Sequence, residues 1–293
     1  MGDSKGCQAA RAELHTHTTY SDGSLTPRRL VEGAEIAGLE ALAVTDHDTV
    51  AGVAEAKSVA QGLRLELIAG LEFSANIEDK EVHLLGLFVD VTCGTLLAAT
   101  ERARAYRRDR AQQIVVKLND LGLDLDFSIV EDEAGAGSIG RPHIAAALVR
   151  RGFVNSVNSA FHRYLGIGCA AFVPKPTLHA QEVIGIVHAA GGVTVLAHPG
   201  SSRVSDESIG ALAAWGLDGF EVRHPKHKME QEAHLRKLIK QTGLLPSGGS
   251  DYHGPGSGRT ALGSYAVPLV WLEALRSRAA RHARNSTSKE SRS

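Results

Sequence analysis

Cysteine is scarce in this sequence of 293 residues, which contains three: Cys7, Cys93 and Cys169. They are widely spaced and include no Cys-x-x-Cys pair, which argues against a thiolate zinc site and fits a reducing compartment. The sequence also has little net charge, since its 32 Lys and Arg residues are balanced by 33 Asp and Glu residues. Because no global charge draws the protein to nucleic acid or to a membrane, any anionic ligand must be attracted locally.

Long apolar runs are absent as well. No window approaches the roughly 18 apolar residues of a membrane span, and residues 1–8 lack the apolar core of a signal peptide. We therefore expect a soluble, cytoplasmic protein. The sequence also contains no Gly-x-Ser-x-Gly elbow and no nucleotide-binding glycine loop. Histidine is unusually abundant, with 14 residues, and several of them lie at the ends of apolar runs.

Apolar runs of strand length alternate with helical patterns along most of the chain. Hydrophobic residues make up 43% of the sequence, enough for the core of one large α/β domain or of one domain with an insertion. We expect strands at 39–45, 63–69, 82–89, 192–198 and 218–222, and helices at 27–37, 50–61, 180–190, 206–215 and 228–242. Thr26 and Pro27 have the residue types of an N-cap and a first helical position. This alternation predicts βαβ units and a parallel sheet.

The alternation breaks between residues 96 and 170, where we expect a small helical insertion. A long basic helix at 96–121 is followed by a glycine-rich link at 135–142 and by helices at 144–151 and 155–165. The basic residues can form a solvated helix face or contact an anion, and Arg141, which lies beside glycines, is the better candidate for an anion contact. The barrel would then comprise residues 11–95 and 171–282, with a last helix at 269–281 and a disordered polar tail at 283–293.

A divalent metal could be bound by the residues between Glu13 and Ser24. In an extended chain His15 and His17 project to the same side, and Asp22 follows in a Ser-Asp-Gly turn that can fold back over them. A His-x-His pattern can equally be the polar edge of a half-exposed strand. The rest of the chain decides between the two interpretations.

Further potential ligands lie at or near the ends of the expected strands: His47, Glu72, His83, His198, Asp251 and His253. In parallel α/β folds the carboxyl ends of strands meet in one place, so these side chains are expected to cluster there. Burying them without a cation would leave polar groups uncompensated. Imidazoles mixed with carboxylates suit Mn²⁺, Zn²⁺ or Fe²⁺, and so many ligands imply two or three ions, plausibly bridged by Glu72. The nucleophile would be a metal-bound hydroxide, with no separate protein nucleophile.

The ordered set His15-Thr-His17, Thr45-Asp-His-Asp48, Gly70-Leu-Glu72, Val82-His83, Ala197-His-Pro199 and Ser250-Asp-Tyr-His253 resembles the PHP (polymerase and histidinol phosphatase) family. The resemblance implies a distorted (β/α)7 barrel whose divalent ions, with Mn²⁺ favoured, hydrolyse phosphoesters. The metal ligands that it implies are His15, His17, Asp22, His47, Glu72, His83, His198, Asp251 and His253. Asp46 would orient one of these ligands rather than bind metal.

Within this family, the insertion, Gly140-Arg-Pro-His143, Phe172-Val-Pro-Lys175 and Gly219-Phe-Glu-Val222 resemble the nucleoside 3′,5′-bisphosphate phosphatases. That subgroup includes enzymes that trim short RNA from the 5′ end. The resemblance implies that Arg141, Lys175 and His227 contact substrate phosphates, although His224 and His227 can equally be surface residues. The partner would be a nucleotide or a short oligonucleotide, with no stable binding of duplex nucleic acid. A histidinol phosphate phosphatase and a non-catalytic metal-binding or polymerase-associated module remain alternatives.

Overall fold

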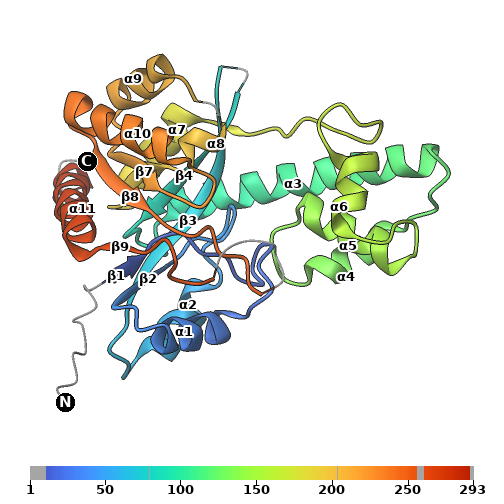
Figure 1. Ribbon diagram of the computed structural model, residues 1–293, viewed down its shortest axis with the longest axis horizontal. Helices are drawn as coiled ribbons and strands as arrows, with labels where there is room; N and C mark the ends of the chain where they lie inside the picture. The colour runs from blue at the N-terminus through green and yellow to red at the C-terminus, as the bar shows by residue number, and fades with distance from the viewer. Residues whose placement is uncertain (1–10, 79, 203, 256–260, 291–293) are drawn as a thin grey trace.

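The computed structural model describes residues 11–290 except 79, 203 and 256–260, with backbone only for 285–290. Within these residues nine strands form one sheet that curls into a nearly closed barrel (Figure 1). The strand order is β8-β7-β6-β4-β3-β2-β1-β9, with β5 beside β3. The strands are β1 (Arg11–Glu13), β2 (Ala41–Val44), β3 (Glu66–Ile77), β4 (Lys80–Leu87), β5 (Leu178–His179), β6 (Val193–Leu196), β7 (Gly219–Arg223), β8 (Leu245–Gly248) and β9 (Val267–Pro268).

The segments that follow β1 and β8 meet and narrow the gap in the barrel. Thr16 pairs with Tyr252 in a parallel bridge, and the His17 amide donates a hydrogen bond of 2.8 Å to the Tyr252 carbonyl. This contact brings the first and last predicted ligand segments side by side. The predicted α/β barrel is confirmed.

The direction of one predicted strand, β4, differs from the prediction. The expected βαβ alternation implies parallel strands, but β4 runs antiparallel to both β3 and β6, and β3 and β4 form a hairpin. The two strands are almost entirely buried over their shared length, so their apolar sequences do not reveal their direction. β3 also extends eight residues beyond the predicted end at residue 69, to Ile77.

Helices surround the barrel: α1 (Pro27–Ile36), α2 (Val53–Ala60), α7 (Ala180–Ala189), α8 (Pro199–Ser202), α9 (Asp206–Ala214), α10 (Met229–Thr242) and α11 (Leu269–Glu290). The Thr26 hydroxyl accepts a hydrogen bond from the Arg29 amide, so it caps α1 as predicted. The expectation of a disordered tail from residue 283 is wrong up to Glu290, because α11 continues that far. No glycine or proline interrupts residues 269–290, so nothing in the sequence ends the helix earlier.

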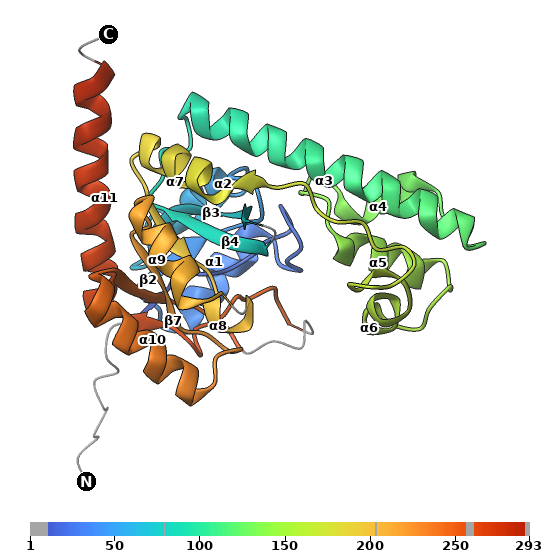
Figure 2. The same cartoon turned by 90° about the horizontal axis from the view of Figure 1, so that it is seen from above.

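The insertion has its own helices: α3 (Gly94–Asp120), α4 (Phe127–Ala134), α5 (Arg141–Arg150), α6 (Val157–Ala160) and a short π-helix, η1 (Phe161–Leu165). Its separate apolar core includes Ile114, Leu118 and Leu148. Leu96 and Ala99, at the start of α3, belong instead to the core of the barrel. Figure 2 shows α3 running from the barrel into the insertion, so one helix joins the two parts. Among the described residues, no helix is long and apolar enough to cross a membrane.

Candidate metal centre

All nine predicted ligands converge on one end of the barrel. His15, His17 and Asp22 follow β1, His47 follows β2, His198 follows β6, and Asp251 and His253 follow β8. Glu72 and His83 lie inside β3 and β4 rather than at strand ends, and the hairpin brings them together with a hydrogen bond of 2.8 Å. Among these nine residues, three overlapping groups have ligand atoms within 4.8 Å of one another: His15, His17 and Glu72; His47, Glu72 and His83; and His17, Asp22, His47 and His253. A further group, His15, Glu221 and His224, overlaps the first.

Glu72 is the carboxylate shared between groups. Its Oε2 lies 3.3 Å from Nε2 of both His15 and His17. Its Oε1 lies 2.8 Å from His83 Nδ1 and 3.2 Å from His198 Nε2. Because the two oxygens face different imidazoles, the carboxylate has the arrangement needed to bridge two cations.

The centre contains buried polar atoms that the protein itself does not satisfy. His15 Nε2, His17 Nε2, Asp22 Oδ1, His47 Nδ1 and Glu72 Oε2 are all buried and have no hydrogen-bond partner among the described residues. A buried polar atom without a partner costs about 1–3 kcal/mol, and five such atoms converge here. Divalent cations would satisfy them, so the donor set fits the predicted ions.

The carboxylates and imidazoles of the centre strongly shift one another's pKa values. Burial would raise the pKa of Glu72, but the imidazoles of His47, His15 and His83 hold it well below its ordinary value. Burial lowers the pKa of His17, but Asp251 and Glu72 outweigh this effect and raise it to about 9. Without cations, protons on the imidazoles balance the carboxylates, and divalent ions would replace those protons.

Several backbone conformations in the centre are unusual. Asp48, His198 and Asp251 have φ values of 53°, 35° and 50°, in the left-handed region that non-glycine residues rarely adopt. Each costs about 1–3 kcal/mol and persists only where the surrounding structure imposes it. The strain coincides with two of the predicted ligands.

Asp46 contacts the loop that carries Asp22 rather than the nine-residue cluster. It accepts hydrogen bonds of 2.7 Å from the Thr18 amide, the Thr18 hydroxyl and the Ser21 hydroxyl. The Ser21 hydroxyl in turn lies 3.4 Å from His17 Nδ1. Asp46 therefore fixes the loop between His17 and Asp22.

Three buried residues of the site were not assigned from the sequence. Glu221 lies 3.0 Å from His15 Nδ1 and accepts the His198 amide at 2.7 Å. Glu13 accepts the amides of Ser250 and Gly263, and burial raises its pKa to about 7. His224 is fully buried beside Asp251. His224 directly follows β7, so the strand-end pattern of the predicted ligands could have identified it, whereas Glu221 lies inside β7.

Positive charge collects where the insertion meets the centre. Arg107 pairs with Asp48, the residue after His47, and donates to the Ser74 hydroxyl at 3.1 Å. Arg107, Arg110 and Arg141 line one narrow cavity between α3 and α5. Burial and the neighbouring Arg141 lower the pKa of Arg110 to about 10. The guanidinium groups are therefore crowded by like charge.

The chain returning from the insertion brings Lys175 into this region. The Phe172 and Val173 carbonyls accept hydrogen bonds from Lys117 and Arg110 of α3. Lys175 contacts the Ser74 hydroxyl and lies 3.7 Å from Glu81, which is itself 3.4 Å from His83 Nε2. The side chain of Glu81 thus lies between the Lys175 ammonium and the predicted ligand His83.

The other two predicted substrate residues differ in their surroundings. Arg141 is half-buried, donates to the Leu165 carbonyl and stacks over the Phe161 ring. His227 contacts backbone with both ring nitrogens: Nδ1 with the Val222 carbonyl and Nε2 with the Gly200 amide. The contacts of His227 do not support the predicted role in phosphate binding, because no ring nitrogen is left for a ligand.

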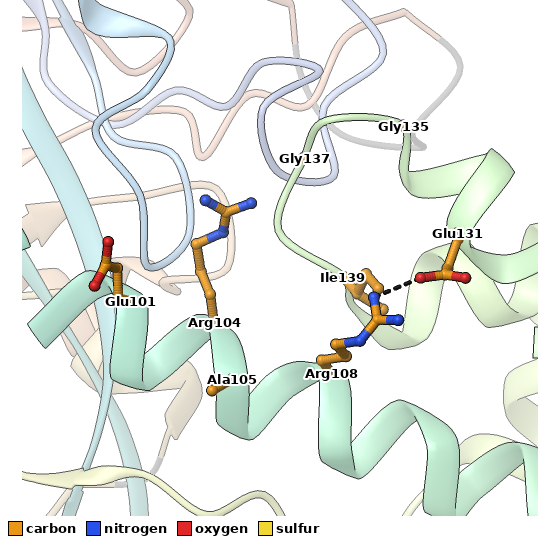
Figure 3. A pocket seen from close by; sticks show the side chains of 8 residues that line it. All are labelled: Glu101, Arg104, Ala105, Arg108, Glu131, Gly135, Gly137 and Ile139. Atoms are coloured by element: carbon orange, nitrogen blue, oxygen red, sulfur yellow. Dashed lines mark ion pairs between the residues drawn. The ribbon is translucent and has the colours of Figure 1, made fainter. Parts of the chain in front are cut away.

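A separate cavity of about 310 Å³ lies between α3 and the segment joining α4 to α5. Figure 3 shows Arg108 facing Glu131, with Arg104 and Glu101 elsewhere along its wall. Its acidic and basic side chains balance, so it lacks the excess positive charge of the Arg107 region.

Comparison with known proteins identifies the family. The PHP domain profile matches residues 13–163. A 5′-3′ exoribonuclease from Haemophilus influenzae is 37% identical over 83% of this chain and 90% of its own length. A 3′,5′-nucleoside bisphosphate phosphatase from Chromobacterium violaceum is 31% identical over 87% of this chain and 91% of its own.

A solved structure agrees with these similarities. A Bifidobacterium adolescentis protein described as a metal-dependent phosphoesterase superimposes with a TM-score of 0.85 at 36% identity, over 91% of this chain and 96% of its own. Homologous sequence, a common fold and a cluster of unsatisfied metal-ligand atoms coincide. The chain therefore belongs to the PHP domain family.

Proposed function

We propose that this protein hydrolyses the 3′-phosphate of nucleoside 3′,5′-bisphosphates and holds the 5′-phosphate with cations at the insertion. The observation that supports this most is an excess of positive charge beside the metal centre. Arg107, Arg110, Arg141 and Lys175 face the carboxylates of Asp48 and Glu81. A substrate with a second phosphate would pair with the basic side chains that these two carboxylates do not neutralise.

The nine predicted ligands would hold the ions, with Glu72 between two of them. When bound, divalent ions would lower the pKa of water to supply the attacking hydroxide and would polarise the phosphoryl oxygens. The mixture of imidazoles and carboxylates among the nine predicted ligands favours Mn²⁺, with Zn²⁺ or Fe²⁺ as alternatives. Lys175 and Arg107 would orient the substrate and neutralise its charge.

A 5′→3′ exoribonuclease acting on short 5′-phosphorylated RNA is the second candidate. It needs the same recognition of a 5′-phosphate and the same attack on the 3′ side, with a nucleotide in place of the terminal phosphate. The name of the Haemophilus influenzae relative favours it, and that of the Chromobacterium violaceum relative favours the phosphatase. Histidinol phosphate has a single phosphate and would leave the extra cations unused.

A comparison of substrates tests the proposal. Metal-loaded protein should release phosphate from adenosine 3′,5′-bisphosphate much faster than from AMP or histidinol phosphate, because only the bisphosphate fills both subsites. Equal rates on all three would contradict the specificity. Length-resolved digestion of a 5′-phosphorylated RNA pentamer under the same conditions separates the exoribonuclease from the phosphatase.

Arg141→Ala tests the second subsite. Losing a charge-assisted hydrogen bond costs about 1.5–3 kcal/mol, so kcat/KM for the bisphosphate should fall about 10- to 100-fold. Hydrolysis of an aryl phosphate, which has no second phosphate, should change little. Arg151→Ala is the matched control, since Arg151 is exposed at the end of the same helix. Equal losses on both substrates would show that Arg141 serves the fold instead.

A further inference from the structure

His224 is a buried residue of the metal centre that the nine predicted ligands do not include. It lies just after β7 and is fully buried, with its ring 5.3 Å from that of His198 and 6.2 Å from that of His15. Within the described part of the chain its Nε2 is buried without a hydrogen-bond partner, and it lies 3.7 Å from Asp251 Oδ2. Position alone would make His224 either a tenth ligand or a hydrogen-bond donor.

The other ring nitrogen decides between these roles. His224 Nδ1 accepts a hydrogen bond of 3.2 Å from the Lys226 amide, so in the neutral ring the proton resides on Nε2. Nε2 is then an N–H donor and has no lone pair for a metal ion.

Two predicted ligands show the opposite pattern. His15 Nδ1 lies 3.0 Å from the Glu221 carboxylate, and His253 Nδ1 lies 2.8 Å from the Asp251 carbonyl. Both Nδ1 atoms face acceptors and carry the proton, which leaves the Nε2 lone pairs directed at the centre. The partners of Nδ1 thus distinguish His224 from these two predicted ligands.

The two carboxylate oxygens of Asp251 face different partners. Oδ1 faces the metal side, 3.4 Å from His17 Nε2 and 3.6 Å from His15 Nε2. Oδ2 faces donors, with Lys226 Nζ at 3.2 Å and His224 Nε2 at 3.7 Å. The Lys226 side chain is 45% exposed, whereas the His224 ring is fully buried, so the ring is the better means of fixing the carboxylate.

We propose that His224 is a positioning residue whose Nε2–H donates to Asp251 Oδ2 and so directs Oδ1 toward the metal ion. The proposal rests on the metal centre of the proposed function and is independent of which phosphoester is the substrate. It assigns His224 a role through Asp251, with no contact to metal or substrate.

Two substitutions test this role. His224→Leu removes the donor, whereas His224→Gln retains an N–H group in the ring position. We expect His224→Leu to lower Mn²⁺ affinity and kcat about 10- to 100-fold with little change in KM, and His224→Gln to restore most of both. His234→Leu is the control, because His234 is exposed and pairs with Asp206 on the surface.

The readouts are bound Mn²⁺ per chain after gel filtration, kcat and KM on an aryl phosphate, and circular dichroism for folding. Unchanged Mn²⁺ affinity and kcat in a folded His224→Leu protein would overturn the proposal. Equal loss of metal in the Leu and Gln variants would also overturn it, because His224 would then be a ligand itself.

A measurement on the unsubstituted protein covers the case in which His224→Leu does not fold. In ¹⁵N-histidine NMR of the Zn²⁺-loaded protein, Nε2 of His224 should carry the proton and Nδ1 should not. A metal-bound or unprotonated Nε2 would contradict the proposal. This result does not depend on catalysis, so it is distinguishable from a failure to hydrolyse any phosphoester.

Discussion

At the scale of single residues, the centre depends on how each carboxylate divides its two oxygens. Glu72 turns Oε1 to His83 and His198 and turns Oε2 to His15 and His17. Asp251 directs Oδ1 to the imidazole of His17 and Oδ2 to the ammonium of Lys226. A substitution that keeps the size of a side chain but removes one oxygen should therefore disrupt a specific part of the site.

Lys175 should give substrate binding a characteristic pH dependence. Burial and the nearby Arg107 lower the pKa of its ammonium to about 8, so it is charged below that pH and neutral above it. KM for a 3′,5′-bisphosphate should therefore rise as the pH increases through 8. Steady-state kinetics between about pH 6.5 and 9.5 measure this, and Lys175→Arg should abolish the rise because arginine stays charged. The same rise in both proteins would assign the titration to another group.

The sequence predicted the clustered histidines and carboxylates better than the residues that orient them. His15 and His17 are recognisable because their spacing puts them on one side of an extended chain. Glu221 orients His15 from 206 positions away, so no local pattern shows the pair. His227 had the residue type of a phosphate ligand, but backbone groups contact both of its ring nitrogens.

At the scale of elements, helix boundaries followed local signals, whereas strand direction did not. Thr26 and Pro27 start α1 as their residue types predict. β4 is antiparallel because a hairpin joins it to β3, and two buried apolar strands look alike in either direction. α11 continues past its predicted end, since no glycine or proline interrupts residues 269–290.

One buried carboxylate attaches α11 to the barrel, and its removal should destabilise the fold. Asp218 accepts hydrogen bonds from Arg278 and His282 of α11 on one oxygen, and from His188 of α7 and the Thr194 amide on the other. Burial raises the pKa of this carboxyl, but the bonds from His188 and His282 outweigh it and lower it to about 2. Since the pKa is lower in the folded protein, the stabilisation is present above about pH 4 and is lost between about pH 4 and 2.

Asp218→Asn should lower the free energy of unfolding at pH 7 by about 2 kcal/mol, as measured by urea denaturation. It should also remove part of the loss of stability between about pH 4 and 2. Asp206→Asn is the control, because Asp206 makes an exposed pair with His234. Equal denaturation midpoints for wild type and Asp218→Asn would show that this network does not stabilise the protein.

At the scale of the whole molecule, the barrel supplies the ligands and the insertion supplies cations. The insertion was recognisable as a break in the alternation of strands and helices, but its position over the centre depends on contacts between distant segments. Arg107 with Asp48 and Lys175 with Ser74 are two of them. The pairing of Thr16 with Tyr252 likewise joins segments from opposite ends of the chain.

The nine predicted ligands would hold two or three divalent ions, with Glu72 between two of them, and metal stoichiometry tests this proposal most directly. Protein saturated with Mn²⁺ and passed through gel filtration should retain two or three equivalents per chain. Folded Glu72→Gln protein should retain at most one, because the bridging anion and one of its oxygens are lost. Less than one equivalent in the wild type, or the same number in both proteins, would contradict the account.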